Sequence, residues 1–359
     1  MYCIRYTIPM QRTIRLRLEP SPSQADALAE SCRQFTSAFN QAVRLGWNEG
    51  ISNATKLHYL AYYPLKANHP TLVSDLINQA RVKAAEALRS AFALKKAGRK
   101  VTMPVSHACA PRYNEHTYRV DWESQTVRIS TTAGRQIIRF SVPDYAAKYV
   151  GHPTDSADLV ERDGQWWLHV VVSVPAPDIP PSDQLVGVDL GINRPAVTSN
   201  NQFLGQKQWK AVEGRYFTLT RALQKRGTRR HLKRVKRRRS RFRRDADHVL
   251  SKQIVGTAEP GGTIVMENLK QIRTRVKAKR RTKTKRRIHS WPFASLKAKV
   301  EYKAEERGCT VVAVDPRHTS QACSRCGHSA RNNRRSRALF VCRACGYALH
   351  ADLNGARNI

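Results

Sequence analysis

Four cysteines, arranged as two pairs, constrain the fold of this chain more than any other feature. Cys323 and Cys326 form one C-x-x-C pair, Cys342 and Cys345 form the other, and 15 residues separate the pairs. Two such knuckles can place four thiolates tetrahedrally around one zinc ion, and four sulfur ligands leave no open position for water. The sequence therefore predicts one structural Zn²⁺, with a redox dithiol or unligated cysteines as the alternatives.

Glycines support the metal interpretation, because Gly327 and Gly346 directly follow the two pairs, where the chain must turn tightly around the ion. The other cysteines are scattered along the sequence, at Cys3, Cys32, Cys109 and Cys309. This distribution does not suggest a disulfide framework.

The charge of the chain is strongly positive and unevenly distributed. Sixty-four Lys and Arg against 27 Asp and Glu give +37 over 359 residues, a self-repulsion that a polyanion would neutralise. From Arg221 to Arg244, Lys or Arg occupies 14 of 24 positions without one acid, and 270–287 is similar. An even solvated surface is the alternative, but runs this dense favour arms that track phosphates and become ordered on nucleic acid. The candidate contacts are Arg229, Arg230, Lys233, Arg234, Lys236, Arg237, Arg238, Arg241, Arg275, Lys277, Lys279, Arg280 and Arg281.

The first half of the chain alternates between strand and helix patterns. Residues 13–18 alternate apolar and charged side chains, as a strand with one buried face does. Ser21, Pro22 and Gln24 form a capping box that begins a helix, and a second helix is expected over 72–96. Short β-rich runs follow at 118–122, 127–130, 137–142 and 166–174, the last preceded by a hairpin turn at Asp163-Gly164. We expect a small antiparallel barrel or sandwich, which the early strand could join across the helical insertion.

A proline-rich linker at 175–181 ends this region, and the second half mixes buried strands with helices. Strands are predicted at 185–189, 263–266 and 311–314, with a returning hairpin at 196–203. A helix is predicted from Phe293 through Ala304 and ends before Gly308. These elements predict an α/β core.

Three acids close or follow the buried runs: Asp189, Glu267 and Asp352. A charge at such a place is costly unless a cation or hydrogen bonds compensate it. Two Mg²⁺ ions roughly 3.5 to 4 Å apart share carboxylate oxygens of this kind and promote phosphodiester hydrolysis. Taken singly, the three acids could instead be a turn former, a surface residue and a helix cap.

At these residues the chain resembles the TnpB family of transposon-encoded RNA-guided nucleases and the related type V CRISPR effectors. The resemblance rests on motifs between about 185 and 359: Gly187-Val-Asp-Leu-Gly-Ile, Met266-Glu-Asn-Leu, Val314-Asp-Pro, Thr319-Ser-Gln-Ala-Cys-Ser-Arg-Cys-Gly, Phe340-Val-Cys-Arg-Ala-Cys-Gly and Ala351-Asp-Leu-Asn-Gly-Ala-Arg-Asn-Ile. Gly355 stands where members commonly have Ala, a difference expected to matter little because Gly is merely a poorer helix former.

The resemblance implies an α+β multidomain fold, with a wedge β-barrel split by a helical recognition domain, then a RuvC nuclease core of RNase H-like fold with an inserted zinc ribbon. The implied segments are 1–20 and 101–182 for the barrel, 21–100 for the helical domain, 183–318 and 348–359 for the nuclease core, and 319–347 for the zinc ribbon. It implies that Asp189, Glu267 and Asp352 are catalytic and bind two Mg²⁺ or Mn²⁺, while the four paired cysteines bind Zn²⁺.

The implied function is RNA-guided cleavage of double-stranded target DNA beside a short flanking motif, with a guide RNA derived from the transposon end and one or two protein copies on the RNA. Delegating recognition to base pairing suits a chain this basic. The alternatives are a nuclease-weak RNA-guided regulator, a small type V CRISPR effector and a strand-transfer transposase. No run reaches the roughly 18 apolar residues that span a bilayer, and the start lacks a secretory signal, so we expect a cytoplasmic, nucleoid-associated prokaryotic protein.

Overall fold

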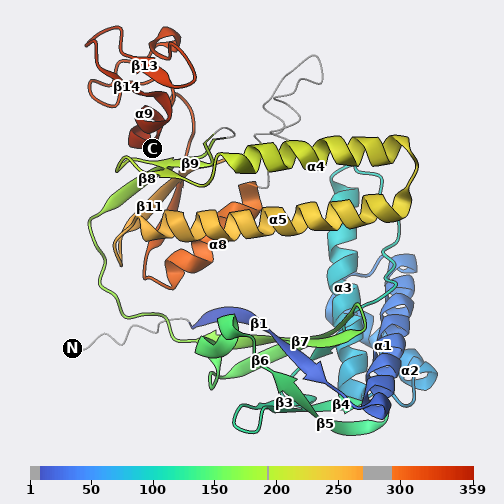
Figure 1. Ribbon diagram of the computed structural model, residues 1–359. Helices are drawn as coiled ribbons and strands as arrows, with labels where there is room; N and C mark the ends of the chain where they lie inside the picture. Colours follow the sequence, from blue (N-terminus) through green and yellow to red (C-terminus); the bar gives the residue numbers. More distant parts are fainter. Residues whose placement is uncertain (1–8, 192–193, 270–292) are drawn as a thin grey trace. The chain divides into compact units, whose positions relative to one another are not determined.

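The computed structural model describes residues 9–191, 194–269 and 293–359. The chain divides into two compact units, Met1–Pro175 and Ala176–Ile359. Both contain helices and strands, so the protein is α+β (Figure 1). In the described part of the chain, no helix is long and apolar enough to cross a membrane.

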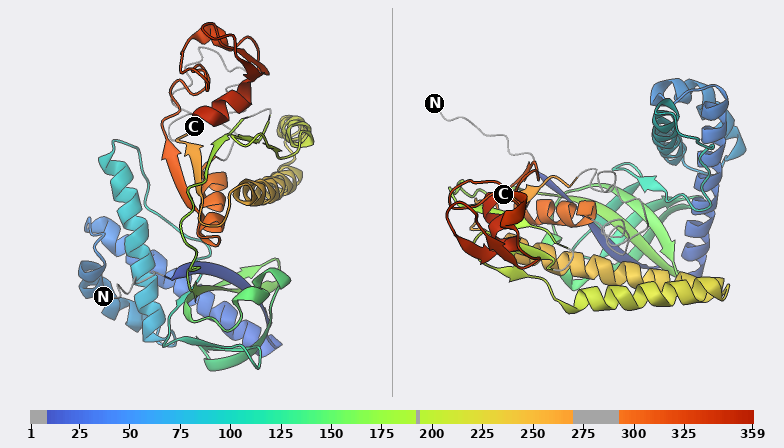
Figure 2. Two further views of the ribbon diagram at one scale, coloured as in Figure 1. Left: turned by 90° about the vertical axis from the view of Figure 1, so that its left-hand side faces the viewer. Right: turned by 90° about the horizontal axis from the view of Figure 1, so that it is seen from above.

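The first unit contains a seven-stranded antiparallel sheet in the order β2-β6-β7-β1-β5-β4-β3. The sheet curves into a nearly closed surface rather than a closed barrel, because its end strands β2 and β3 are not paired in the described region (Figure 2). Its strands are β1 (Met10–Glu19), β2 (Arg112–Tyr113), β3 (Tyr118–Asp121), β4 (Thr126–Thr131), β5 (Gly134–Ser141), β6 (Thr154–Arg162) and β7 (Gln165–Val174), and a 3₁₀ helix, η1 (Asp144–Tyr149), precedes β6.

The expectation that the early strand joins this sheet across the helical insertion is confirmed. β1 pairs antiparallel with β7, from Met10 opposite Val174 to Leu18 opposite Trp166, and also with β5. The hairpin between β6 and β7 turns at Asp163 and Gly164, whose φ angles are +52° and +76°, as a two-residue hairpin turn requires.

Three helices separate β1 from the rest of the sheet: α1 (Pro22–Asn48), α2 (Ala54–Asn68) and α3 (Ser74–Lys96). The predicted capping box is confirmed, since the Ser21 hydroxyl accepts from the Gln24 amide and the Gln24 side chain accepts from the Ser21 amide. α2 was not predicted separately. All three helices pack against one another, and their apolar faces share one core with the sheet.

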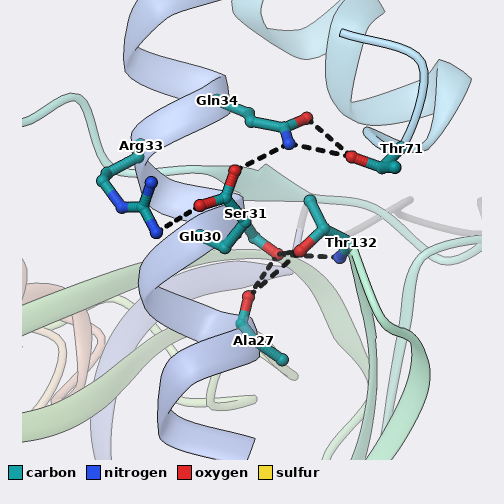
Figure 3. Close-up of polar contacts among 7 residues, drawn as sticks. All are labelled: Ala27, Glu30, Ser31, Arg33, Gln34, Thr71 and Thr132. Atoms are coloured by element: carbon teal, nitrogen blue, oxygen red, sulfur yellow. Dashed lines mark hydrogen bonds and ion pairs between the residues drawn. The ribbon is translucent and has the colours of Figure 1, made fainter.

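Polar contacts fix α1 at two successive turns (Figure 3). The Ser31 hydroxyl donates to the Ala27 carbonyl at 2.7 Å and accepts from the Thr132 amide, in the turn between β4 and β5, at 3.0 Å. About one turn further along α1, the Gln34 amide nitrogen donates to Glu30 and to the Thr71 hydroxyl in the loop before α3. α1 is therefore tied both to the sheet and to the other helices.

The second unit contains a five-stranded mixed sheet in the order β10-β9-β8-β11-β12. β8 is parallel to β11, and β11 is parallel to β12, whereas β9 and β10 return antiparallel on the other side. The strands are β8 (Leu185–Asp189), β9 (Ala196–Thr198), β10 (Phe203–Leu204), β11 (Thr263–Glu267) and β12 (Thr310–Val314). The predicted α/β core is confirmed.

Helices α5 (Arg229–Gly256) and α8 (Phe293–Glu305) pack against each other and share an apolar core with the sheet. α4 (Gln208–Lys225) lies antiparallel along α5 (Figure 1). The chain then forms the cysteine-bearing module with η2 (Arg331–Asn333) and the paired strands β13 (Leu339–Val341) and β14 (Ala348–His350), followed directly by α9 (Ala351–Asn358), which packs on β8 and β9.

Candidate nuclease and zinc centres

The two central parallel strands bring the first two acids to the same edge of the sheet. Val188 of β8 is in register with Met266 of β11, and Asp189 and Glu267 directly follow this pair. Adjacent parallel strands end at the same edge, so the two carboxylates emerge side by side. Both side chains are half-buried.

Asp352 reaches the same place from the helix that packs on β8. Gly187 and Gly355 permit the close packing of α9 on this strand: a Cβ at Gly187 would collide with the Ala356 carbonyl, and one at Gly355 would lie 3.1 Å from the Asp189 Oδ2. Asp352 lies in the first turn of α9, where His350 caps the helix by accepting from the Asp352 amide at 3.3 Å. The three acids, far apart in sequence, therefore converge.

The electrostatics of Asp189 reflect this convergence. Its pKa is raised to about 7, first by burial, then by the negative charges of Glu267 and Asp352, against the opposing charge of Arg334. The pKa of Glu267 is also raised by burial, although a hydrogen bond from Thr319 opposes the shift. Half-buried carboxylates that repel one another in this way are a suitable donor set for a hard divalent cation, which prefers oxygen ligands.

Two neighbours of the acids were missed in the sequence. The Arg334 Nη2 donates to the Asp352 Oδ1 at 2.9 Å, and the Thr319 hydroxyl donates to the Glu267 Oε1 at 2.8 Å. Arg334 was one of many basic residues between the two cysteine pairs, and no spacing rule distinguished it. Thr319 stood in a recognised motif, but only tertiary structure shows its contact with Glu267.

The four paired cysteines form a single cluster, as predicted. All four sulfur atoms lie within 4.8 Å of one another, with the Cys323 and Cys345 Sγ atoms 3.8 Å apart and the Cys326 and Cys342 Sγ atoms 3.6 Å apart. A tetrahedral site with Zn–S bonds of about 2.3 Å has sulfur atoms about 3.8 Å apart. The cluster therefore fits one structural zinc ion.

The two knuckles have the turn that their glycines suggested. Gly327 and Gly346 have φ angles of +75° and +68°, and their amides donate to the Cys323 and Cys342 carbonyls, respectively. The backbone N–H of Cys345 lowers the pKa of Cys342 to about 6. The pKa of Cys326 moves the other way, to about 12: the His328 N–H lowers it, but the neighbouring thiols and burial raise it more. Sulfurs this close hold several negative charges only with a cation between them.

The first basic run does not have the structure expected from its charge. We predicted arms that become ordered on nucleic acid, but residues 221–244 lie in two long helices, α4 and α5, joined by a short turn. Leu232, Val235 and Phe242 are half-buried on one side of α5, and Phe242 contacts Tyr216 of α4 with ring centroids 6.0 Å apart. This apolar stripe, which the charge density concealed, orders the run within the protein itself.

An acid inside the helical hairpin adds to this order. Glu213 of α4 accepts hydrogen bonds of 2.6–3.1 Å from the guanidinium groups of Arg239 and Arg243 of α5. Burial raises the pKa of Glu213, but these hydrogen bonds and charges outweigh burial and lower it. Arg239 and Arg243 were not among the predicted nucleic-acid contacts. The predicted contacts on α5 are all exposed: Arg229, Arg230, Lys233, Arg234, Lys236, Arg237, Arg238 and Arg241. Arg275, Lys277, Lys279, Arg280 and Arg281 lie outside the described residues.

Parts of the sequence have clear relatives. The family model "Cas12f1-like, TNB domain" matches residues 293–359. A 120-residue stretch is 44% identical to the CRISPR-associated endodeoxyribonuclease Cas12f1 of Sulfoacidibacillus thermotolerans, covering 33% of this chain and 26% of that protein. A 224-residue stretch is 31% identical to the putative RNA-guided DNA endonuclease InsQ of Escherichia coli K12, covering 55% of this chain and 53% of that protein. The chain thus spans about a quarter to a half of the length of these relatives.

Solved structures share the fold at low sequence identity. A Cas12f1–sgRNA–target DNA complex matches with a TM-score of 0.62 and 17% identity, over 93% of this chain and 82% of that one. CasPhi-2 bound to crRNA matches with a TM-score of 0.53 and 10% identity, over 98% of both chains.

A further relative in sequence is a TnpB-like protein of Aquifex aeolicus, which is 35% identical over 97 residues, covering 26% of this chain and 31% of that protein. Parts of the chain are thus similar in sequence to Cas12f1, InsQ and TnpB-like proteins, and the chain shares the fold of the Cas12f1 and CasPhi-2 structures.

Proposed function

We propose that this protein is an RNA-guided DNA endonuclease that hydrolyses phosphodiester bonds of target DNA beside a short flanking motif. The observation that carries the proposal is the convergence of Asp189, Glu267 and Asp352, which follows from the register of β8 with β11 and the packing of α9 on β8. Relatives named RNA-guided DNA endonuclease and endodeoxyribonuclease support the same reaction.

In this proposal the second unit is a RuvC core of RNase H-like fold at 183–318 and 348–359, interrupted by a zinc ribbon at 319–347. Its support is the mixed sheet, in which three parallel strands carry an antiparallel hairpin at one side. The first unit is a wedge domain at 1–20 and 101–182, split by a helical recognition domain at 21–100. Its support is the pairing of β1 with β7 across the three helices.

Asp189, Glu267 and Asp352 would hold two Mg²⁺ or Mn²⁺ ions. When bound, such a pair supplies an activated water and neutralises charge on the leaving oxygen. The protein's own part is to hold the three carboxylates in place: Arg334 orients Asp352, and Thr319 orients Glu267. The cysteine cluster would hold one structural Zn²⁺.

The exposed basic face of α5 would neutralise phosphates of the guide RNA or of its duplex with DNA. Guide pairing then selects the sequence, so the protein needs backbone contacts and a reader for the flanking motif, which we assign to the first unit. The net charge of +37 supports nucleic acid as the main partner. Whether the guide comes from a transposon end or from a CRISPR array is a question of its source, which RNA co-purified with the protein would identify.

The test is a cleavage assay with purified protein, its co-expressed RNA, Mg²⁺ and a plasmid that matches the guide. We expect the parent protein to cut, Asp189→Ala to abolish cutting without loss of RNA, and Asp178→Ala, which removes an exposed acid from the connecting segment, to cut normally. An intact plasmid bound by the parent complex would favour a regulator, and joined products would favour a strand-transfer transposase.

A further inference from the structure

α9 carries two asparagines in addition to Asp352. Asn354 is fully buried; its Nδ2 donates to the Ala322 carbonyl at 2.8 Å, and its Oδ1 accepts from the Ser324 amide at 3.0 Å. Asn358, one turn later, donates to the Thr319 carbonyl at 2.8 Å and to the Ala322 carbonyl at 2.7 Å. Together these side chains bind the segment that leads into the first cysteine knuckle.

The same segment reaches the nuclease centre through Thr319. The Asn358 side chain donates to the Thr319 carbonyl. The Thr319 hydroxyl lies 2.8 Å from the Glu267 Oε1 and 3.1 Å from the Pro316 carbonyl. A hydroxyl has one proton, and an ionised carboxylate is the stronger acceptor. Glu267 therefore receives a hydrogen bond whose donor is positioned by α9.

The other end of the segment is a zinc ligand. Cys323 directly follows Ala322, is 1% exposed, and its amide donates to the His328 carbonyl within the knuckle. Arg334, on the loop between the two cysteine pairs, binds Asp352. Two independent routes thus connect the cysteine module to the acids, one through Thr319 to Glu267 and one through Arg334 to Asp352.

We propose that Thr319, Asn354 and Asn358 are positioning residues that make the geometry of the three-acid centre depend on a folded, zinc-loaded cysteine module. Loss of zinc would then disturb the acids, although no cysteine touches them. This inference rests on the proposed function for the identity of the centre, but the contacts that carry it do not. The alternative is that the three side chains only stabilise the fold.

The first experiment separates positioning from stability by measuring Mn²⁺ binding to the protein without nucleic acid, by calorimetric titration, alongside thermal unfolding and zinc content. Thr319→Val keeps the shape of the side chain but removes the donor, and we expect Mn²⁺ to bind about 10-fold more weakly with zinc retained. Thr319→Ser restores the hydroxyl and should bind Mn²⁺ as the parent does. The matched control is Thr257→Val, which removes another buried hydroxyl, bonded to the Ile254 carbonyl.

Two results of this titration would overturn the proposal. One is unchanged Mn²⁺ affinity in Thr319→Val. The other is equal weakening in Thr319→Ser and Thr319→Val, which would mean that packing rather than the hydroxyl matters.

The second experiment measures amide hydrogen exchange after zinc loss and does not need Mn²⁺ to bind. Cys326→Ser with Cys345→Ser removes two exposed ligands. We expect faster exchange across 351–358 and 316–322, with exchange across 229–256 unchanged. Unchanged exchange in α9 would show that the module and the centre are independent. If the parent does not bind Mn²⁺ but exchange in α9 responds to zinc loss, the proposed nuclease centre is wrong and the positioning role stands.

Discussion

At the scale of single residues, two glycines control how closely α9 approaches β8. Gly187 faces the backbone of α9 at Ala356, and Gly355 faces the carboxylate of Asp189. The sequence suggested that Gly355 is merely a poorer helix former than Ala. The structure adds that a methyl group there would lie 3.1 Å from the Oδ2 of Asp189, so the side-chain space at this position is part of the candidate site.

Gly187→Ala should therefore separate α9 from β8. The new Cβ would collide with the Ala356 carbonyl, and overpacking of this kind costs about 1–3 kcal/mol. We expect a lower free energy of unfolding in urea, together with weaker cleavage because Asp352 moves with the helix. The control is Gly214→Ala in α4, where nothing lies within 4 Å of the added methyl and helix propensity predicts a gain of about 0.5–1 kcal/mol. Equal stability of the two variants would contradict this explanation.

Arg334 is the second residue whose importance only the tertiary structure reveals. Arg334→Ala removes the guanidinium that orients Asp352, and we expect single-turnover cleavage to fall about 10-fold, as for other groups that orient metal ligands. Arg335→Ala, which removes the neighbouring exposed arginine, should cut at the parental rate. A normal rate in Arg334→Ala would mean that Asp352 is positioned by α9 alone.

At the scale of elements, the hairpin of α4 and α5 shows how a highly charged segment can fold. Leu232, Val235 and Phe242 form a narrow apolar stripe, and Glu213 forms ion pairs with two of the many arginines. Charge-assisted hydrogen bonds to a half-buried carboxylate contribute about 1.5–3 kcal/mol. The hairpin thus presents its remaining cations on a preformed surface, which lowers the ordering cost of binding.

Glu213→Gln should loosen this hairpin by about 2 kcal/mol, because two guanidinium groups lose their shared anion. Faster hydrogen exchange across 208–256 would reveal the loss, and Asp245→Asn, an exposed change on α5, should have little effect. Since the pKa of Glu213 is lowered in the folded protein, its contribution is present above the ordinary glutamate range and is lost as the pH falls through the lowered pKa. Exchange in Glu213→Gln should accordingly respond less to acid than exchange in the parent.

Sequence patterns predicted elements well where local chemistry and burial agreed. The strand at 185–189 has the predicted bounds, and β9 and β10 form the hairpin predicted at 196–203, because short apolar runs there end at glycine or asparagine turns. β6 was missed because its buried face has only Ala157 and Leu159, with Asp155 and Glu161 at the flanking positions of the same alternation, and α2 because its buried stripe is only Leu57, Ala61 and Leu65 around Pro64. The acids and cysteines were found by position and motif, whereas Thr319 and Arg334 contact the acids only after distant segments have packed together.

At the scale of the whole molecule, charge is the dominant property. A net charge of +37 destabilises the free protein by self-repulsion, while a bound polyanion converts the same charge into attraction. The two states should therefore respond to salt in opposite directions.

We expect the Tm of the RNA-free protein to rise between about 0.01 and 0.15 M salt, as the screening length shortens from about 30 to 8 Å. The Tm of the RNA complex should fall over the same range, because salt weakens RNA binding and the stabilisation that binding supplies. Differential scanning fluorimetry of both samples measures the two slopes. Parallel slopes would mean that the cations are locally neutralised within the protein.

The wide separation of the three acids along the chain has a consequence for biosynthesis. A nascent chain that has emerged as far as β12 carries Asp189 and Glu267 but not Asp352, which follows the whole cysteine module. Domains fold as they leave the ribosome, amino-terminal parts first. If the proposed function is right, a ribosome-bound intermediate that lacks Asp352 would not cut DNA, and cleavage would begin only once translation has passed α9.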